Sequence, residues 1–257
     1  ALCVTGMGKV NSAMTLQAIL MDDRFDFSNA YIISTGCAGS AIEYGVMGDV
    51  FVITATVDFD LGHHADARDL TTDLATTWFH DESYDDASAK LLNQELCEKV
   101  FNLVKDVQIE TTEKTRAFMA ATFDNADWAI RDPKVLRGTT VTGDNYWKGM
   151  HDHANALLMT ETYGCPDPYA LTEMEDHAMS VVLDRLGMLD RYIIIRDSVN
   201  TDVFMNGASP ESLWDPNFVD SLASESSVES ADIFATAMKN NFTVGHVVID
   251  AILNGEL

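Results

Sequence analysis

The sequence has no long apolar run. Its most apolar stretches, such as residues 50–57, have the length of a strand, well short of the ~18–20 residues that a helix needs to cross a bilayer. We therefore expect no integral membrane segment. The chain begins inside a predicted strand at residues 1–5 instead of with a signal peptide. Because a domain seldom begins in mid-strand, we expect a further N-terminal segment ahead of it.

Positive charge is also scarce. The chain has 16 Lys and Arg against 41 Asp and Glu, which gives a formal net charge of -25. Such a surface repels nucleic acid and anionic membranes, so we expect no nucleic-acid partner. The charge suits a secreted, periplasmic or cell-surface protein, and a well-solvated cytoplasmic protein stays open as an alternative.

Cysteines are few, and linkers, internal repeats and low-complexity tracts are missing. The four cysteines, at positions 3, 37, 97 and 165, have no metal-ligand spacing. Their even number permits disulfides, although a chain of 257 residues does not need them. The uniform pattern predicts a single domain over residues 1–257.

Strand and helix patterns alternate along the chain. Strands are predicted at residues 2–5, 31–35, 46–59, 134–141 and 191–196, and helices at 11–21, 85–107, 118–130 and 174–186, with one or two more within 226–254. Residues 61–83 have no regular pattern. The strand–helix–strand order near the start indicates a parallel βαβ unit and hence an α/β fold.

Two glycine-containing segments follow predicted strands. Gly6-Met7-Gly8-Lys9 is predicted to be a turn into a helix, where backbone amides favour an anion or polar ligand. Its spacing matches neither a P-loop nor a dinucleotide fingerprint, and close helix–strand packing explains it equally well. Gly36-Cys37-Ala38-Gly39 is predicted to be a second turn that lets the backbone approach a ligand. Cys37 has no identifiable base, so a packed thiol is favoured over a nucleophile.

A further segment is dense in metal-ligand types. His63 or His64 with Asp60 or Asp66 could hold a metal ion. The favoured interpretation is a loop in which Asp66 and Arg68 bond locally and one histidine faces a pocket. Further along, Tyr146 and Trp147 offer rings on which a purine can stack, although packing on the core explains these rings equally well.

Two polar segments near the last strand carry the strongest functional indication. Residues 172–176 open a predicted helix, and residues 197–200 are predicted to be a polar turn after strand 191–196. Ligands of open α/β sheets sit at the carboxyl ends of strands, so we expect both segments to meet one small polar ligand. The Glu175 carboxylate can accept hydrogen bonds from a diol, and the Asn200 amide can donate and accept. A carboxylate favoured by the helix dipole is the alternative interpretation of Glu175.

Five motifs resemble one family in form and order. They are GMGKVNSA at residues 6–13, DLGHHADAR at 60–68, TGDNYWKG at 142–149, EMED at 173–176 and IIIRDSVN at 193–200. Together they resemble the purine nucleoside permease-like family of the nucleoside phosphorylase superfamily, over nearly the whole chain. The resemblance implies a three-layer α/β/α sandwich around a mixed, mostly parallel sheet. It also implies assembly as a dimer, trimer or hexamer.

The resemblance further implies roles for single residues. Met174 and Glu175 would contact the ribose, with Glu175 on the 2′- and 3′-hydroxyls, and Asn200 would contact the purine near N7. Some nucleosidases have an acid at the position of Asn200, which protonates N7, whereas an amide donates a hydrogen bond without supplying a proton. Asp197 and Asp202 are nearby alternatives for the acid. The other candidate substrate contacts are Gly36, Cys37, Ala38, Tyr146, Trp147, His63 and Asp202.

Phosphorolysis needs a phosphate site, usually built with arginine. Superfamily phosphorylases often carry an arginine just before the second small-residue turn, where this chain has Ser34-Thr35, as a hydrolytic relative does. Gly8, Lys9 and Arg68 are the candidate anion-binding residues. Phosphate as a co-substrate therefore stays open, and we expect no other cofactor and no metal.

The expected function is purine nucleoside binding with cleavage of the N-glycosidic bond, in nucleoside salvage or uptake. Glu175 would stabilise an oxocarbenium-like ribosyl cation, and Asn200 would stabilise the departing purine. Because Asn200 is no acid, a non-catalytic nucleoside-binding or transport component is the alternative. A storage or structural protein on the same fold is a third possibility.

Overall fold

The fold is built around strand β2 (Val50–Asp58), in which every residue is buried. A run of buried residues is typical of a strand in a sheet covered on both faces. The computed structural model describes residues 1–72, 76–122, 126–203 and 216–257. All statements below concern these residues.

The main sheet is mixed. Its other strands are β1 (Ile32–Ser40), β5 (Ala89–Leu91), β6 (Val135–Thr142), β7 (Tyr169–Glu173) and β8 (Tyr192–Thr201). The strand order is β5-β2-β6-β7-β1-β8, and β8 also pairs with β2, so five strands close into a ring to which β5 is attached. The longest pairings, β1–β8 and β2–β6, are parallel. The predicted α/β fold with a mixed, mostly parallel sheet is confirmed.

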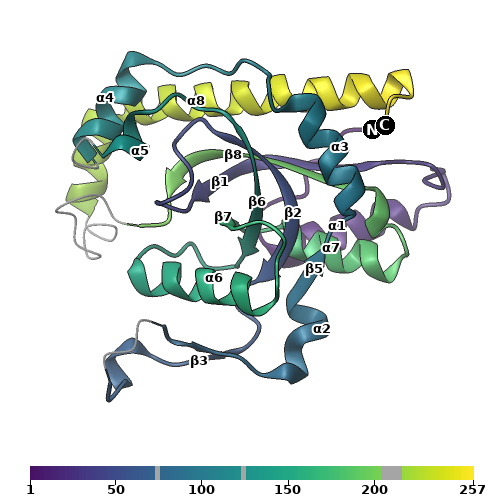
Figure 1. Cartoon of the computed structure of the whole chain (residues 1–257), viewed down its shortest axis with the longest axis horizontal. Coiled ribbons are helices and arrows are strands. Elements are labelled where there is room, and N and C mark those ends of the chain that lie inside the picture. The colour runs from purple at the N-terminus through teal and green to yellow at the C-terminus, as the bar shows by residue number, and fades with distance from the viewer. Residues whose placement is uncertain (73–75, 123–125, 204–215) are drawn as a thin grey trace.

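Helices cover the sheet on both faces (Figure 1). Helices α3 (Gln94–Val104) and α8 (Pro216–Asn254) lie on one face, and α1 (Lys9–Leu20) and α7 (Asp176–Arg185) lie on the other. Helix α6 (Met150–Thr162) packs against β6 and β7, where Ala156 and Met159 share a buried cluster with Val57 of β2. The alternation of side chains in β2 explains these layers. Val52 belongs to a buried cluster with Val248 of α8. Ile53 belongs to another with Leu16 of α1 and Leu183 of α7.

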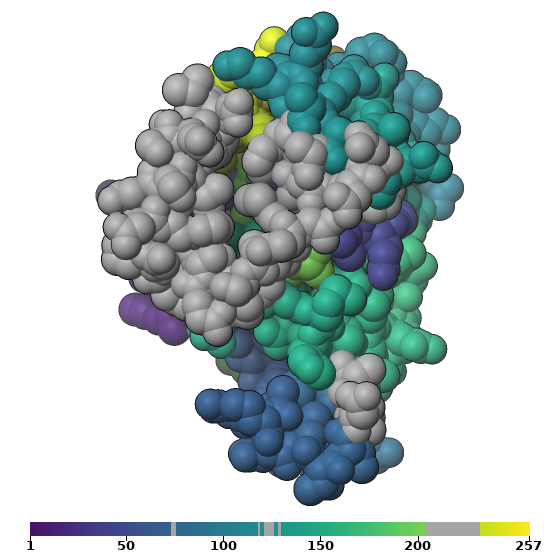
Figure 2. Space-filling model, turned by 90° about the vertical axis from the view of Figure 1, so that its left-hand side faces the viewer, coloured from purple at the N-terminus to yellow at the C-terminus, as the bar shows by residue number. Residues whose placement is uncertain are grey.

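The remaining elements are short. They are β3 (His63–His64), η1 (Ala67–Asp69), β4 (Trp78–Phe79), η2 (Glu82–Tyr84), α2 (Asp85–Ser88), α4 (Glu113–Thr122), α5 (Asp127–Ile130) and η3 (Leu189–Arg191). Strands β3 and β4 form a separate two-stranded sheet. The segment that carries β3, η1, β4 and η2 (residues 63–72 and 76–84) projects from the body of the molecule at the lower edge of Figures 1 and 2. We call it the projecting segment.

Two predicted turns are strands in the structure. Residues 36–39 lie inside β1 and residues 197–200 lie inside β8, where the two segments pair with each other. The predictions of turns were wrong because polar and small residues at these positions are satisfied by long-range contacts. Asp197, for example, accepts a hydrogen bond of 2.5 Å from Asn241 of α8.

Other boundaries also differ from the sequence-based predictions. Residues 2–5 form no strand, strand β7 was missed, and the predicted helix 85–107 is divided into α2, β5 and α3. Residues 118–130 contain the end of α4 and all of α5, with 123–125 outside the described residues. Residues 201–217, whose two prolines predict a loop, also lie mostly outside them. The four cysteines are unpaired. Among the described helices, none is both long and apolar enough to cross a membrane.

Gly138 of β6 packs tightly against β7. A Cβ at this position would lie 2.2 Å from the Cβ of Ala170 and 3.6 Å from Cδ1 of Phe51. We therefore expect Gly138→Ala to lower the free energy of unfolding, measured by urea denaturation, by about 1–3 kcal/mol. The double variant with Ala170→Gly removes the clashing methyl group and should recover part of this loss. A single variant as stable as the wild type would contradict the close packing.

Candidate functional site

Glu173, the last residue of β7, satisfies the first backbone amides of α7. Its Oε2 accepts hydrogen bonds from the backbone N–H of Glu175 at 2.7 Å and of Asp176 at 2.8 Å. Its Oε1 accepts from the hydroxyls of Thr140, at 3.1 Å, and Thr142. Unsatisfied amides at a helix start need such acceptors. Because Glu173 supplies them, the carboxylate of Glu175 is free for another role.

The Glu175 carboxylate lies between α1 and β8. Its Oε1 accepts a hydrogen bond of 2.9 Å from the backbone N–H of Gly8, and its Oε2 accepts one of 3.2 Å from Nη2 of Arg196. The side chain is 16% exposed. A carboxylate has about four lone-pair sites, so each oxygen keeps one for a further donor. Gly8 has a φ of 92°, a left-handed conformation that glycine adopts without strain.

Arg196 joins three carboxylates in the interior. Its Nε and Nη2 bind the two oxygens of Asp176 at 2.8 and 2.7 Å, and Nη2 also lies 3.3 Å from Glu173 and 3.2 Å from Glu175. The guanidinium passes over Gly36 of β1, where a Cβ would come within 2.7 Å of Nη1. The glycine at position 36 therefore makes room for this arginine.

The cluster holds more negative groups than positive ones. Burial of unpaired charge is costly, and one guanidinium cannot neutralise three carboxylates. Burial first, and then repulsion from Asp176, raise the pKa of Glu173 to about 7, although Arg196 opposes the shift. The excess of negative charge therefore raises the pKa of the Glu173 carboxyl, while its contacts with two backbone amides hold the start of α7 in place.

The start of α1 is occupied by the protein's own carboxylates. Lys9 donates its backbone N–H to Asp144 at 2.8 Å, and its Nζ lies 2.8 Å from both Asp58 and Asp60. The neighbouring amide of Gly8 is bound to Glu175. The predicted anion site at Gly8 and Lys9 stays a prediction, and these contacts leave it no free cation.

Asn200 lies on the same part of the sheet as the segment that precedes Glu175. In the strand register Asn200 is opposite Gly39 of β1, and Gly39 is opposite Thr172 of β7. With strands about 4.8 Å apart, two strand spacings of about 10 Å separate Asn200 from Thr172. A Cβ at Gly39 would lie 2.6 Å from Oδ1 of Asn200. The Asn200 Nδ2 donates to the exposed hydroxyl of Tyr146 at 3.2 Å.

Two predicted site residues lie in the projecting segment instead. The Nε2 of His63 is 3.1 Å from Asp81, and the exposed Arg68 binds Asp66 at 2.5 Å. No contact joins them to Glu175 or Asn200 among the described residues. In the described parts of the chain, no group of three or more His, Cys, Asp or Glu is arranged to hold a metal ion.

Other predicted site residues belong to the core. Trp147 is buried and stacks on Phe59 with ring centroids 4.9 Å apart, and Ala38 is buried. Asp202 is buried and contacts Nδ1 of His153 at 2.7 Å and the hydroxyl of Tyr169 at 2.8 Å. The alternative interpretation of Trp147 as a packed aromatic therefore fits its contacts.

The remaining candidates border the cluster without a bond to Glu175. Met174 is half-buried between two of the carboxylate residues. Partial burial, and then the nearby Asp197, raise the pKa of the Cys37 thiol, which disfavours a thiolate nucleophile. Asp197 itself is buried, with its pKa raised to about 6 by burial. It points away from Arg196 because neighbouring residues in a strand face opposite sides.

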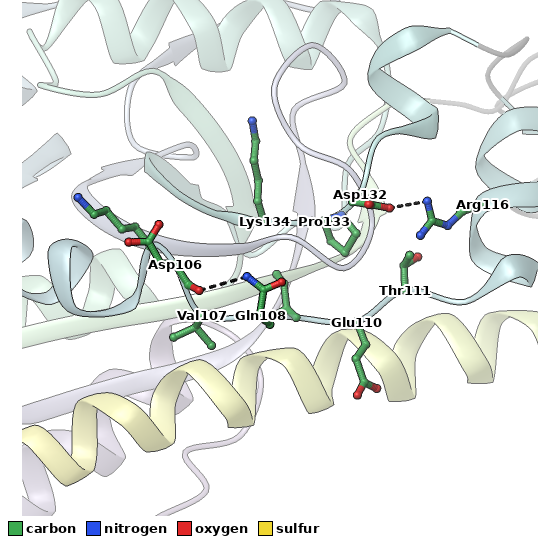
Figure 3. A pocket seen from close by; sticks show the side chains of 11 residues that line it. Asp106, Val107, Gln108, Glu110, Thr111, Arg116, Asp132, Pro133 and Lys134 are labelled. Atoms are coloured by element: carbon green, nitrogen blue, oxygen red, sulfur yellow. Dashed lines mark hydrogen bonds and ion pairs between the residues drawn. The ribbon is translucent and has the colours of Figure 1, made fainter.

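A cleft of about 330 Å³ lies elsewhere, beside α8. Residues 105–111, 116 and 132–134 line it, and Figure 3 shows Arg116 paired with Asp132 at one end. None of the predicted site residues is part of its lining.

Sequence reasoning missed Arg196 and two of its partners, Glu173 and Asp176, as well as Ser34, whose hydroxyl donates to Asp176 at 2.6 Å. One signal was present, because Arg196 ends an apolar run of isoleucines in a strand predicted to be buried. A buried arginine needs carboxylate partners, and the EMED segment offered them.

The raised pKa of Glu173 predicts that stability depends on pH. In the unfolded chain Glu173 ionises near pH ~4.3, but in the folded protein only near a pKa of about 7, so the free energy of unfolding falls as the pH rises between these values. Glu173→Gln cannot ionise. Its stability relative to the wild type should therefore rise by about 1–3 kcal/mol between pH 5 and pH 8, measured by urea denaturation.

Glu161→Gln is the matched control, since this carboxylate is exposed on α6. Its stability should follow that of the wild type at every pH. Stability curves for Glu173→Gln and the wild type that stay parallel from pH 5 to pH 8 would contradict a raised pKa of Glu173.

Solved structures with a similar fold include nucleosidases and a hydrolase. The 5′-methylthioadenosine/S-adenosylhomocysteine nucleosidase of Neisseria meningitidis aligns with a TM-score of 0.52 at 18% identity, over 95% of this chain and 78% of that one. The futalosine hydrolase of Helicobacter pylori aligns with a TM-score of 0.53 at 15% identity, over 96% and 77%. At these identities the likeness concerns the fold alone.

Curated relatives are more similar in sequence. A probable purine nucleoside permease of Schizosaccharomyces pombe is 28% identical over 224 residues, which cover 77% of this chain and 63% of that protein. The purine nucleoside permease of Candida albicans is 24% identical over 212 residues, covering 75% and 52%. The chain thus spans less than two thirds of the length of these relatives. The family model described as "Purine nucleoside permease (NUP)" matches residues 1–256, and the chain therefore belongs to the purine nucleoside permease family.

Proposed function

We propose that this chain binds purine nucleosides beside Glu175 and Asn200 and hydrolyses their N-glycosidic bond. The observation that carries the proposal is the state of the Glu175 carboxylate. Its Oε1 accepts a hydrogen bond from the backbone N–H of Gly8, and its Oε2 accepts one from Arg196. Each oxygen keeps one acceptor site for a further donor. A carboxylate fixed in this way is suited to two adjacent hydroxyls, such as those of a ribose.

The proposed reaction assigns one task to each polar group. As the bond between the anomeric carbon and the purine breaks, its electron pair leaves with the purine and the sugar becomes an oxocarbenium-like cation. The negative charge of Glu175 stabilises that cation, and the amide of Asn200 donates a hydrogen bond to the purine. Water then adds its oxygen to the anomeric carbon, and its proton neutralises the purine.

The charge balance favours water over phosphate as the attacking group. Two cations lie near the Glu175 carboxylate, and both are already paired with carboxylates. Lys9 binds Asp58 and Asp60, and Arg196 binds the three carboxylates of the buried cluster. A phosphate dianion would have to enter a region of net negative charge, and phosphate sites usually present arginine. Arg68, the other candidate, is bound to Asp66.

The names of relatives support a nucleoside ligand. The curated relatives are named purine nucleoside permeases, and the structures of similar fold include nucleosidases solved with adenine or methylthio-immucillin-A. The word permease also supports a role in nucleoside uptake or salvage. We further propose that the chain acts as a homo-oligomer outside the cytoplasm.

A non-catalytic nucleoside-binding component is the second candidate. Asn200 favours it, because an amide cannot give a proton to the departing base. The names of the curated relatives describe transport and not cleavage. In this case Glu175 and Asn200 would bind the nucleoside and leave its glycosidic bond intact.

Incubation of the purified chain with inosine or adenosine tests the proposal. We expect the same release of free base with and without phosphate, measured by chromatography. Glu175→Gln should lower the release by about 100-fold, because its amide group would face the donors of Gly8 or Arg196. The exposed Glu161→Gln is the control and should retain full activity.

The other outcomes separate the candidates. Release of base only in the presence of phosphate would contradict hydrolysis. Nucleoside binding by calorimetry without any release would support the non-catalytic component instead. Neither binding nor release would contradict a nucleoside site at Glu175.

A further inference from the structure

The outer surface of α8 carries a row of exposed apolar side chains. The exposed fractions are 48% for Phe234, 36% for Met238, 71% for Phe242, 42% for Ile249 and 78% for Leu253. The opposite side of this helix is buried in the core, at Ile233, Ala237, Val244, Val248 and Ala251. Figure 1 shows α8 along the outside of the molecule, and the exposed fractions show that other described residues leave the row uncovered. We call these five residues and Gly245 the α8 stripe.

The spacing of the α8 stripe is the same in both directions. Successive members are four, four, three, four and four residues apart, which keeps them on one side of a helix. The central spacings of four, three and four are those of a coiled-coil seam. A pattern that is unchanged on reversal fits a copy of itself in the antiparallel direction.

The α8 stripe exposes a sizeable apolar area. From the exposed fractions, its side chains present roughly 500 Å² of apolar surface, in the upper part of the ~300–600 Å² range of the largest patch on a typical monomer, which is often functional. With flanking residues on α8, the surface approaches the ~800 Å² per partner of a stable interface.

Charge also favours a second copy at this surface. Two chains of net charge -25 repel each other, so a contact between copies needs a surface with few carboxylates. The α8 stripe contains no acidic residue, and the exposed residues between its members, Ala235, Lys239, His246 and Asp250, include one carboxylate. The single lysine also makes a lipid surface a poor match, since helices that lie on membranes carry many basic residues on their polar side.

We propose that the α8 stripe binds the α8 stripe of a second copy, with the helices antiparallel about a two-fold axis. The register that aligns the two patterns places Phe234 opposite Leu253 and Met238 opposite Ile249 of the other copy. Phe242 then lies opposite Gly245. The contact is isologous, as in most homodimers.

Gly245 gives this register a physical reason. A Cβ at Gly245 would meet no atom within 4 Å, so the glycine is not required by packing within the chain. Glycine also weakens a helix interior. In the proposed dimer the missing side chain leaves room for the ring of Phe242, the most exposed aromatic of the stripe.

The flanking charges agree with the same register. Lys239 of one copy lies within two residues of the position opposite Asp250 of the other. In the single chain, Lys239 binds Glu110 at 2.6 Å and Asp250 lies 3.7 Å from His246, and all four side chains are more than half exposed. Exposed pairs of this kind are weak and exchange easily, so these charges are free to pair across the contact.

Sedimentation velocity of the full chain over a range of concentrations tests the dimer. We expect a monomer–dimer equilibrium whose dissociation constant rises about 30-fold or more in Phe242→Glu. Phe79→Glu replaces an aromatic residue that is 45% exposed on β4, and this control should dimerise as the wild type does. A wild-type chain that stays monomeric, or a dimer that Phe242→Glu leaves unchanged, would overturn the proposal. So would a monomeric chain that binds neutral lipid vesicles through the stripe.

Disulfide crosslinking tests the register independently of affinity. In a background without the exposed Cys3 and Cys37, we expect Phe242→Cys to form covalent dimers under mild oxidation. Leu253→Cys should not, because the two sulfur atoms would be about 29 Å apart along the helices. A mixture of Phe234→Cys and Leu253→Cys chains should crosslink to each other. Efficient dimers of Leu253→Cys alone would overturn the antiparallel arrangement.

Discussion

The buried guanidinium of Arg196 is the interaction on which the arrangement of the site depends. It extends from β8 across Gly36 of β1 and binds the carboxylates at the end of β7 and the start of α7. Its contact with Glu175 and the amide of Gly8 together fix that side chain. Without this cation, three carboxylates would lie together in the interior with no compensating charge, which the cost of burying charge forbids. The sheet closes around this pairing, since β8 also joins β2.

The sequence revealed local patterns better than long-range partners. Strand β2 and helix α7, which begins at the EMED segment, followed from apolar runs and helix spacing. The segments at 36–39 and 197–200 were predicted to be turns because glycine and polar residues usually end strands. Their true state depends on pairing between β1 and β8, about 160 residues apart in the chain. The carboxylate partners of Lys9 are likewise distant in sequence, so its charge looked available for an anion.

The acidic composition has different consequences at the site and at the surface. Beside Glu175, the cations Lys9 and Arg196 are already matched by carboxylates, which favours hydroxyl groups over anions as the partners of Glu175. On the outside, the same excess of negative charge restricts contact between copies to surfaces such as the α8 stripe. Membership of the purine nucleoside permease family agrees with a nucleoside as the ligand. Whether the glycosidic bond is cleaved depends instead on the chemistry of Asn200.

The central claim is that the Glu175 carboxylate, held by Gly8 and Arg196, accepts the two hydroxyls of a ribose. The most direct test compares the binding of adenosine and 2′,3′-dideoxyadenosine by titration calorimetry under conditions without turnover. Loss of both hydroxyls leaves two acceptor sites of a part-buried carboxylate unpaired. The account therefore predicts binding of the dideoxy compound at least about 100-fold weaker than that of adenosine. Equal affinity for the two compounds would contradict it.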